Sequence, residues 1–172
     1  INMYVEEGNK YYIRNIEWVG NTVYKTDYLQ AVLDMKKGDV YNQKLLNDRI
    51  STDEFSIGNL YYNNGYVFYQ LDPVEVNIVG DSVDLEMRIS EGPQAKISRV
   101  KITGNDRVYE HVVRRELRNK PGDLFSKAAL ERSYREIANM GHFNPENIQP
   151  DIQPDGTNGT VDIAWGLEPK SN

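Results

Sequence analysis

The chain contains no cysteine, only two histidines and no long apolar run, and each of these absences excludes a class of function. Without cysteine there is no thiol nucleophile and no thiolate metal site. His111 and His142 form no H-E-x-x-H-type pair, and the scattered carboxylates are better explained as solvated faces than as acid–base pairs. No stretch approaches the roughly 20 apolar residues of a membrane helix. We therefore expect no enzyme, no metal site and no cofactor.

The chain also has no surplus of basic residues: its formal net charge is −6 and its pI is near 5.0. Binding to nucleic acid would require a basic face, so we expect no nucleic-acid partner. A length of 172 residues suits one ordinary domain or two small ones. The chain opens on Ile1 rather than methionine, and we expect it to be a fragment of a longer protein. Residues 1–10 and 170–172 are then expected to be linkers, or the end of a preceding module.

An internal repeat decides between one domain and two. Gly20-Asn21 recurs 84 positions later as Gly104-Asn105, and Gly38-Asp39 recurs at the same offset as Gly122-Asp123. Asn42 and Ser126, two good helix caps, are also 84 positions apart. A repeat of this period indicates two copies of one small module. We expect the copies to occupy residues 11–92 and 93–169, joined by the short connector Glu91, Gly92 and Pro93.

Hydrophobic periodicity gives both copies the same order of elements. In the first copy it predicts a strand over 11–19, a helix capped by Thr26, and one long helix from Asn42 to Gly65. Extended chain follows over 66–79, broken at Asp72-Pro73, and then an alternating strand over 83–89. The second copy repeats this order, with a short strand over 148–152 that prolines 150 and 154 mark as an edge. The fold class is α+β, with two tandem β-α-α-β-β modules.

Three short motifs stand at fixed places in this order of elements: Gly-Asn after the first strand, Gly-Asp between the helices, and Glu-Gly-Pro after the last strand. Together they resemble the POTRA domains that stand in tandem in the periplasm, before the membrane β-barrel of Omp85-family outer-membrane proteins. The runs V-V-R-R-E-L-R, G-D-L-F and N-M-G-H-F of the second copy resemble the last such domain before the barrel. The spacing from Gly38 to Gly65 departs from the second copy by eight extra residues.

The resemblance implies a three-stranded mixed sheet in each module, covered on one face by two antiparallel helices. It also implies a location on the periplasmic side of the bacterial outer membrane, with the chain's own β-barrel following it. The strand after the helices would lie at the sheet edge, where unpaired N–H and C=O groups can accept an extended peptide by β-augmentation. The client-binding residues predicted on these edges are Phe68, Tyr69, Gln70, Leu71, Val74, Val76 and Ile78, with Ile148, Gln149 and Ile152 in the second copy.

A second predicted surface is the basic and acidic run Arg114, Arg115 and Glu116. The resemblance implies that this helix faces an accessory lipoprotein of the assembly complex through charge pairs. The expected function is a non-enzymatic region that receives unfolded outer-membrane proteins and docks such lipoproteins. Two alternatives stay open at this point: the same modules in a two-partner secretion or related export barrel, and a structural or cell-division ectodomain without unfolded clients.

Overall fold

The computed structural model describes residues 10–104 and 107–170, which form two compact units with the same order of elements. The first unit holds the described residues up to Leu60 together with Tyr69–Glu91, and the second holds Tyr61–Phe68 together with those from Gly92 onward. Most of both predicted linkers, residues 1–9 and 171–172, lies outside the described residues. Within the described ranges, no helix has the length and apolarity needed to cross a membrane.

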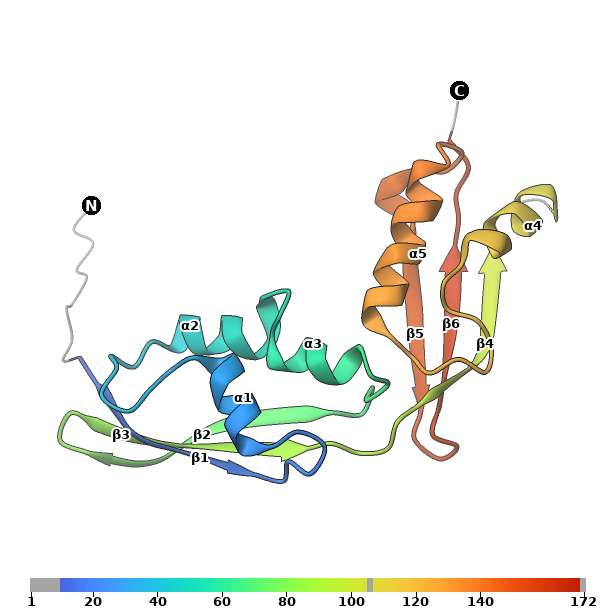
Figure 1. Ribbon diagram of the computed structural model, residues 1–172. Coiled ribbons are helices and arrows are strands. Elements are labelled where there is room, and N and C mark those ends of the chain that lie inside the picture. Colours follow the sequence, from blue (N-terminus) through green and yellow to red (C-terminus); the bar gives the residue numbers. More distant parts are fainter. Residues whose placement is uncertain (1–9, 105–106, 171–172) are drawn as a thin grey trace, which may run out of the picture. The chain divides into compact units, whose positions relative to one another are not determined.

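The first unit is a three-stranded mixed sheet with its helices on one face (Figure 1). Its central strand β3 pairs in parallel with β1 and antiparallel with β2, so the strand order is β1-β3-β2. Buried residues of β3 alternate with exposed or half-buried ones, and the buried set packs under the helices. In chain order the elements are β1 (Tyr12–Val19), α1 (Thr26–Leu33), α2 (Gln43–Asn47), the π-helix η1 (Asp48–Thr52), α3 (Ile57–Tyr62), β2 (Gln70–Val79) and β3 (Ser82–Ser90). The last two residues of α3 belong to the second unit.

The second unit repeats this architecture with the strand order β4-β6-β5. Trp165, near the end of the central strand, is fully buried, and one continuous apolar core surrounds it. The elements are β4 (Lys96–Thr103), α4 (Arg107–Glu116), α5 (Lys127–Asn139), the 3-10 helix η2 (Pro145–Asn147), β5 (Gln149–Asp155) and β6 (Thr160–Gly166). The predicted α+β class and the two tandem β-α-α-β-β modules are confirmed.

The repeated glycines perform the same task in both units. Gly38 N–H donates to the carbonyl of Ile13 at 2.7 Å, and Gly122 N–H donates to Ile97 at 2.8 Å. The predicted caps also act alike, because the side chain of Asn42 accepts from Leu45 N and that of Ser126 accepts from Ala129 N. The 84-residue repeat is therefore a repeat of turns and caps, which fix where each helix begins relative to its sheet.

One predicted cap is wrong by a single position. Thr26 is the first residue of α1, and Lys25 holds the N-cap place without a side-chain hydrogen bond. The Thr26 hydroxyl instead accepts a hydrogen bond from the Asn21 amide at 3.2 Å. The Asn21 amide also donates to the carbonyl of Tyr24 at 2.9 Å. The Gly-Asn signal therefore continues into the next loop, where asparagine holds the turn that leads into the helix.

Candidate binding groove along strand β2

Strand β2 forms one edge of the first sheet, and its inner side pairs with β3 from Gln70 to Val79. The predicted break at Asp72-Pro73 is absent, since Pro73 lies within the strand opposite Met87. Proline has no N–H to donate, so a ladder tolerates it where that side of the backbone faces away from the neighbouring strand. Pro73 therefore removes one N–H donor from the outer edge of β2 without ending the strand.

A β-bulge follows Glu75 and decides which side chains of β2 face the helices. Leu71, Pro73 and Glu75 lie opposite Ile89, Met87 and Leu85, all buried residues on the helical face of β3. Directly opposite residues share a face of the sheet. The register then shifts by one residue, and Ile78 lies opposite Val83, which is also buried. Before and after the bulge, β2 thus presents four side chains to the helical face: Leu71, Pro73, Glu75 and Ile78.

Between this face of β2 and the first unit's helical layer runs a groove made of two adjoining hollows. The first hollow has a volume of about 550 Å³ and the second about 660 Å³. Tyr41, Gln43 and Glu75 line both, so they stand where the hollows meet. The first is completed by Leu46, Asn47, Ile50, Ser51, Leu71 and Pro73, and the second by Tyr11, Val40, Asn42, Lys44, Ile78 and Val83.

Hydrogen bonds across the groove hold the carboxylate of Glu75. The Tyr41 hydroxyl donates to Glu75 Oε1 at 2.9 Å, and Gln43 Nε2 donates to the same oxygen at 3.2 Å. Burial of the phenol and its hydrogen bond to Glu75 raise the pKa of Tyr41 to about 12. The hydroxyl therefore stays protonated at neutral pH and remains a donor. Glu75 is fixed at the centre of the groove.

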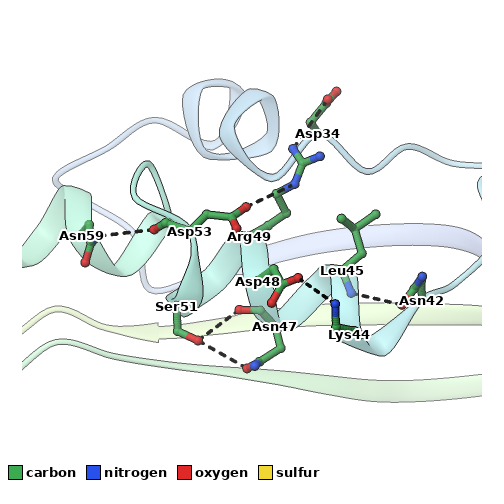
Figure 2. A network of polar contacts seen from close by, with 10 residues as sticks. All are labelled: Asp34, Asn42, Lys44, Leu45, Asn47, Asp48, Arg49, Ser51, Asp53 and Asn59. Atoms are coloured by element: carbon green, nitrogen blue, oxygen red, sulfur yellow. Dashed lines mark hydrogen bonds and ion pairs between the residues drawn. The ribbon is translucent and has the colours of Figure 1, made fainter.

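The helical wall departs from the single helix predicted between Asn42 and Gly65. Helix α2 runs for five residues, continues as the π-turn η1 of five residues, and ends before the separate helix α3. Figure 2 shows how polar contacts hold this stretch: Arg49 reaches Asp34 and Asp53, both at 3.7 Å, and Lys44 reaches Asp48 at 3.8 Å. π-turns commonly arise where residues are inserted into a helix and are frequent at functional sites. The eight extra residues of the first copy lie between Ile50, which keeps the 84-residue offset with Tyr134, and Gly65, so the break between η1 and α3 accommodates them.

The equivalent edge of the second unit, β5, is built differently. Pro150 and Pro154 lie opposite Trp165 and Val161, with Ile152 opposite Ile163 between them. These three positions alternate, so their outer backbone groups face the same way, and only the middle one carries an N–H. Two hollows lie beside this edge. One has about 290 Å³ and is lined by Leu130, Glu131, Tyr134, Ile148, Gln149 and Pro150. The other has about 280 Å³ and is lined by Tyr62, Val67, Phe125, Lys127, Leu130, Glu131, Ile152 and Pro154. The second edge therefore offers an added strand fewer donors and less room.

The predicted client-binding residues divide into three groups in the structure. Leu71 and Ile78 line the groove, and Ile152 and Gln149 lie on the second edge strand. Phe68 and Tyr69 precede β2, and Tyr69 is buried; Ile148 precedes β5 and is fully buried in the second core. Gln70 begins β2 and is exposed, Val74 lies opposite Glu86 on the other face, and Val76 is the residue at the bulge. Sequence reasoning missed Tyr41, Gln43 and Glu75, because the bulge that puts Glu75 and Ile78 on one face leaves no clear signal and the hydrogen bonds to Glu75 span more than 30 positions.

The predicted docking residues lie at the end of α4. Arg114 donates to the carbonyl of Val100 at 3.2 Å and to Glu110 at 3.2 Å, which ties the helix to its own sheet. Arg115 is exposed and Glu116 is half-buried. Beside them is a hollow of about 360 Å³ with a basic rim and an apolar floor, lined by Val100, His111, Arg114, Arg115, Leu117, Asn119, Lys120 and Pro121.

Glu91, predicted only as part of the connector, belongs to the fold of the first unit. Its side chain is buried, and Oε1 accepts from Thr22 N–H at 2.9 Å and from the Thr22 hydroxyl at 2.6 Å. Oε2 accepts from Val23 N–H at 2.9 Å. The carboxylate therefore anchors the loop that leaves β1. Gly92 and Pro93 follow it in the chain.

These features define a class, a tandem pair of β-α-α-β-β modules whose sheets each leave a strand edge beside a groove. The model of the POTRA family, described as "Surface antigen variable number repeat", matches residues 11–92 and 95–168, and the chain belongs to this family. Two solved structures share the fold: Haemophilus influenzae BamA POTRA3-5 has a TM-score of 0.76 at 18% identity, covering 92% of this chain and 61% of that one. Haemophilus ducreyi BamA lacking POTRA domains 1-3 has a TM-score of 0.74 at 20% identity, covering 93% and 30%.

Sequence relatives extend the comparison to longer proteins. Outer membrane protein assembly factor BamA of Neisseria meningitidis serogroup B is 28% identical over 174 residues, covering 99% of this chain and 21% of the relative. A protein of Treponema pallidum (strain Nichols) is 27% identical over 168 residues, covering 97% and 19%. The chain thus spans about one fifth of the length of the relatives it matches.

Proposed function

We propose that the chain is the non-enzymatic, periplasmic protein-binding region of an outer-membrane protein assembly factor. In this role it receives unfolded outer-membrane proteins as extended segments that add to the outer edge of β2. The names of the BamA relatives support the assembly role, and the family supports a place beside a membrane β-barrel that the same protein would carry. The single observation that carries the proposal is the edge of β2 standing beside a groove lined by both apolar and polar side chains.

Strand addition suits such clients because main-chain hydrogen bonds are indifferent to sequence, while the groove accepts alternate side chains. The outer edge of β2 keeps N–H groups at Leu71, Glu75 and Ile78, and loses one at Pro73. The equivalent positions in β5 keep one N–H, at Ile152. We therefore assign the principal client edge to β2, with β5 accepting a shorter pairing around Ile152.

An NMR titration tests this assignment. Peptides copied from outer-membrane β-strands are expected to shift the backbone amides of Gln70–Val79 at submillimolar to millimolar concentration, with smaller shifts at Gln149–Asp155. A doubly proline-substituted peptide, which lacks donors on its pairing side, is the control and is expected to shift neither strand. Shifts confined to the helices at millimolar peptide would contradict strand addition and favour a scaffold role.

We also propose that the end of α4 docks an accessory lipoprotein through Arg115 and Glu116, with Arg114 holding the helix on its sheet. Glu116→Lys in the full-length protein is expected to reduce co-purification of the lipoprotein by about tenfold, since a mispaired charge at an interface costs on the order of 1.4 kcal/mol or more. Glu136→Lys on α5, an equally half-buried glutamate, is the matched control and should leave co-purification unchanged. Equal recovery with both variants would contradict docking at α4.

A further inference from the structure

Glu75 provides the only carboxylate among the described residues that line the groove. Both of its hydrogen bonds from Tyr41 and Gln43 end on Oε1. A carboxylate can accept about four hydrogen bonds, so Oε2 keeps capacity for a donor from a bound chain. The one lysine on the lining, Lys44, is largely exposed and lies 3.8 Å from Asp48, which partly offsets its charge. The centre of the groove is therefore electronegative.

Apolar surface lies on both sides of this centre. Towards the start of β2 are Leu71 and Pro73, which face Leu46 and Ile50 across the first hollow. Towards its end are Ile78 and Val40, which are 53% and 47% exposed and line the second hollow. Exposed apolar side chains that flank an electronegative centre offer burial to apolar groups at each end and an ion pair between them.

The second unit supplies an internal comparison at the same places. Glu75 lies opposite Leu85 and Ile152 lies opposite Ile163, and both partners are the second buried residue of the central strand. When the two edge strands are aligned through their partners on the central strand in this way, Ile78 corresponds to Pro154, and Pro73 corresponds to Pro150. The helical walls correspond as well, since Leu46, Asn47 and Ile50 recur 84 positions later as Leu130, Glu131 and Tyr134. Both units share the proline, but at the central strand position the first has the carboxylate of Glu75 and the second has Ile152. The carboxylate on the second lining, Glu131, comes from helix α5, where Lys127 lines the same hollow.

From this contrast we infer that the first unit is selective among extended chains. Its groove binds segments in which a cationic side chain, lysine or arginine, stands between two apolar side chains at alternating positions. An added strand places every second side chain over the groove, so the apolar residues enter the two hollows and the cation meets Glu75 Oε2. This inference rests on the proposed function and narrows its client class. The second unit has Ile152 at this strand position and both Glu131 and Lys127 on its lining, so its preference for a cation is weaker.

The test uses this 172-residue chain and two synthetic peptides. Both carry valine two positions before and after a central residue, which is lysine in one and glutamate in the other. The dissociation constants are measured by NMR from the amides of β2 at low ionic strength. We expect the lysine peptide to bind about threefold to tenfold more tightly, as for an exposed ion pair replaced by a like-charge contact. The difference should shrink in high salt.

Two variants separate the carboxylate from the groove. Glu75→Gln keeps an acceptor for Tyr41 and removes the charge, and Glu75→Ile installs the residue of the second unit. Both are expected to bind the two peptides within about twofold of each other, with amide spectra that otherwise match the unchanged chain. Equal binding of the two peptides to β2 of the unchanged chain would overturn the selectivity while strand addition stands. Binding of neither peptide would overturn the proposed function and the selectivity with it. A lysine preference that shifts the acidic pair Asp53-Glu54 after η1 instead of β2 would also overturn the selectivity.

Discussion

Replacing Gly20 with alanine is expected to lower the free energy of unfolding of the first unit by about 2–5 kcal/mol. Gly20 has φ = +92°, a conformation that costs an L-residue about 1–2 kcal/mol. A Cβ there would also lie 2.0 Å from the carbonyl oxygen of Ile89, and moving that strand apart costs about 1–3 kcal/mol more. Urea unfolding followed by Trp18 fluorescence, in a Trp165→Phe background that removes the second tryptophan, measures the loss.

Gly38→Ala is the matched control for this substitution. Gly38 has φ = +95°, nearly the same backbone conformation, but a Cβ at this position meets nothing within 4 Å. Its expected loss is therefore the conformational part alone, about 1–2 kcal/mol. The difference between the two variants isolates the contact with Ile89. Equal losses would show that backbone conformation, and not the close approach of β1's exit to β3, makes glycine necessary after the first strand.

Replacing Glu91 with alanine is the second substitution with a large expected effect, about 2–4 kcal/mol on the first unit. The change removes a buried carboxylate that accepts three hydrogen bonds, and hydrogen bonds to charged groups contribute about 1.5–3 kcal/mol. It also leaves the N–H groups of Thr22 and Val23 without this acceptor. The same urea experiment, with Trp18 as the probe, reports the loss.

Two further variants show whether the loss comes from the buried hydrogen bonds. Glu91→Gln keeps one carbonyl acceptor and should lose less than Glu91→Ala. Glu86→Ala removes a glutamate whose ion pair with Arg88 is solvent-exposed, and such pairs contribute about 0–1 kcal/mol. If Glu91→Ala were no worse than Glu86→Ala, the connector residue would have no part in holding the loop that leaves β1.

The turns and caps of this fold could be predicted from the sequence because their determinants are local. Gly38 and Gly122 occur where the chain must adopt a positive φ, and Asn42 and Ser126 occur where helix N–H groups need an acceptor. Each of these requirements involves residues a few positions apart. Alternation along β3 and β6 was equally readable, since both strands bury one face against the helices.

The groove could not be predicted in the same way, because its geometry depends on partners far apart in the chain. Val74, Val76 and Ile78 look like one face of a strand, yet the bulge after Glu75 puts Ile78 beside Glu75 and moves Val74 to the opposite face. The contact between Tyr41 and Glu75 spans 34 positions. The division of the helix into α2, η1 and α3 is likewise concealed by the continuous apolar pattern from Leu46 to Tyr61.

The bulge in β2 has a consequence for how the two copies have diverged since duplication. The glycine turns and the caps Asn42 and Ser126 recur in both copies, whereas the second helix is divided only in the first copy. The edge strand also differs, because Glu75 and Ile78 of the first copy correspond to Ile152 and Pro154 of the second. A duplicated module whose scaffold and edge strand vary independently can acquire a new ligand preference by a few substitutions in one segment, and a series of such modules can diversify without refolding.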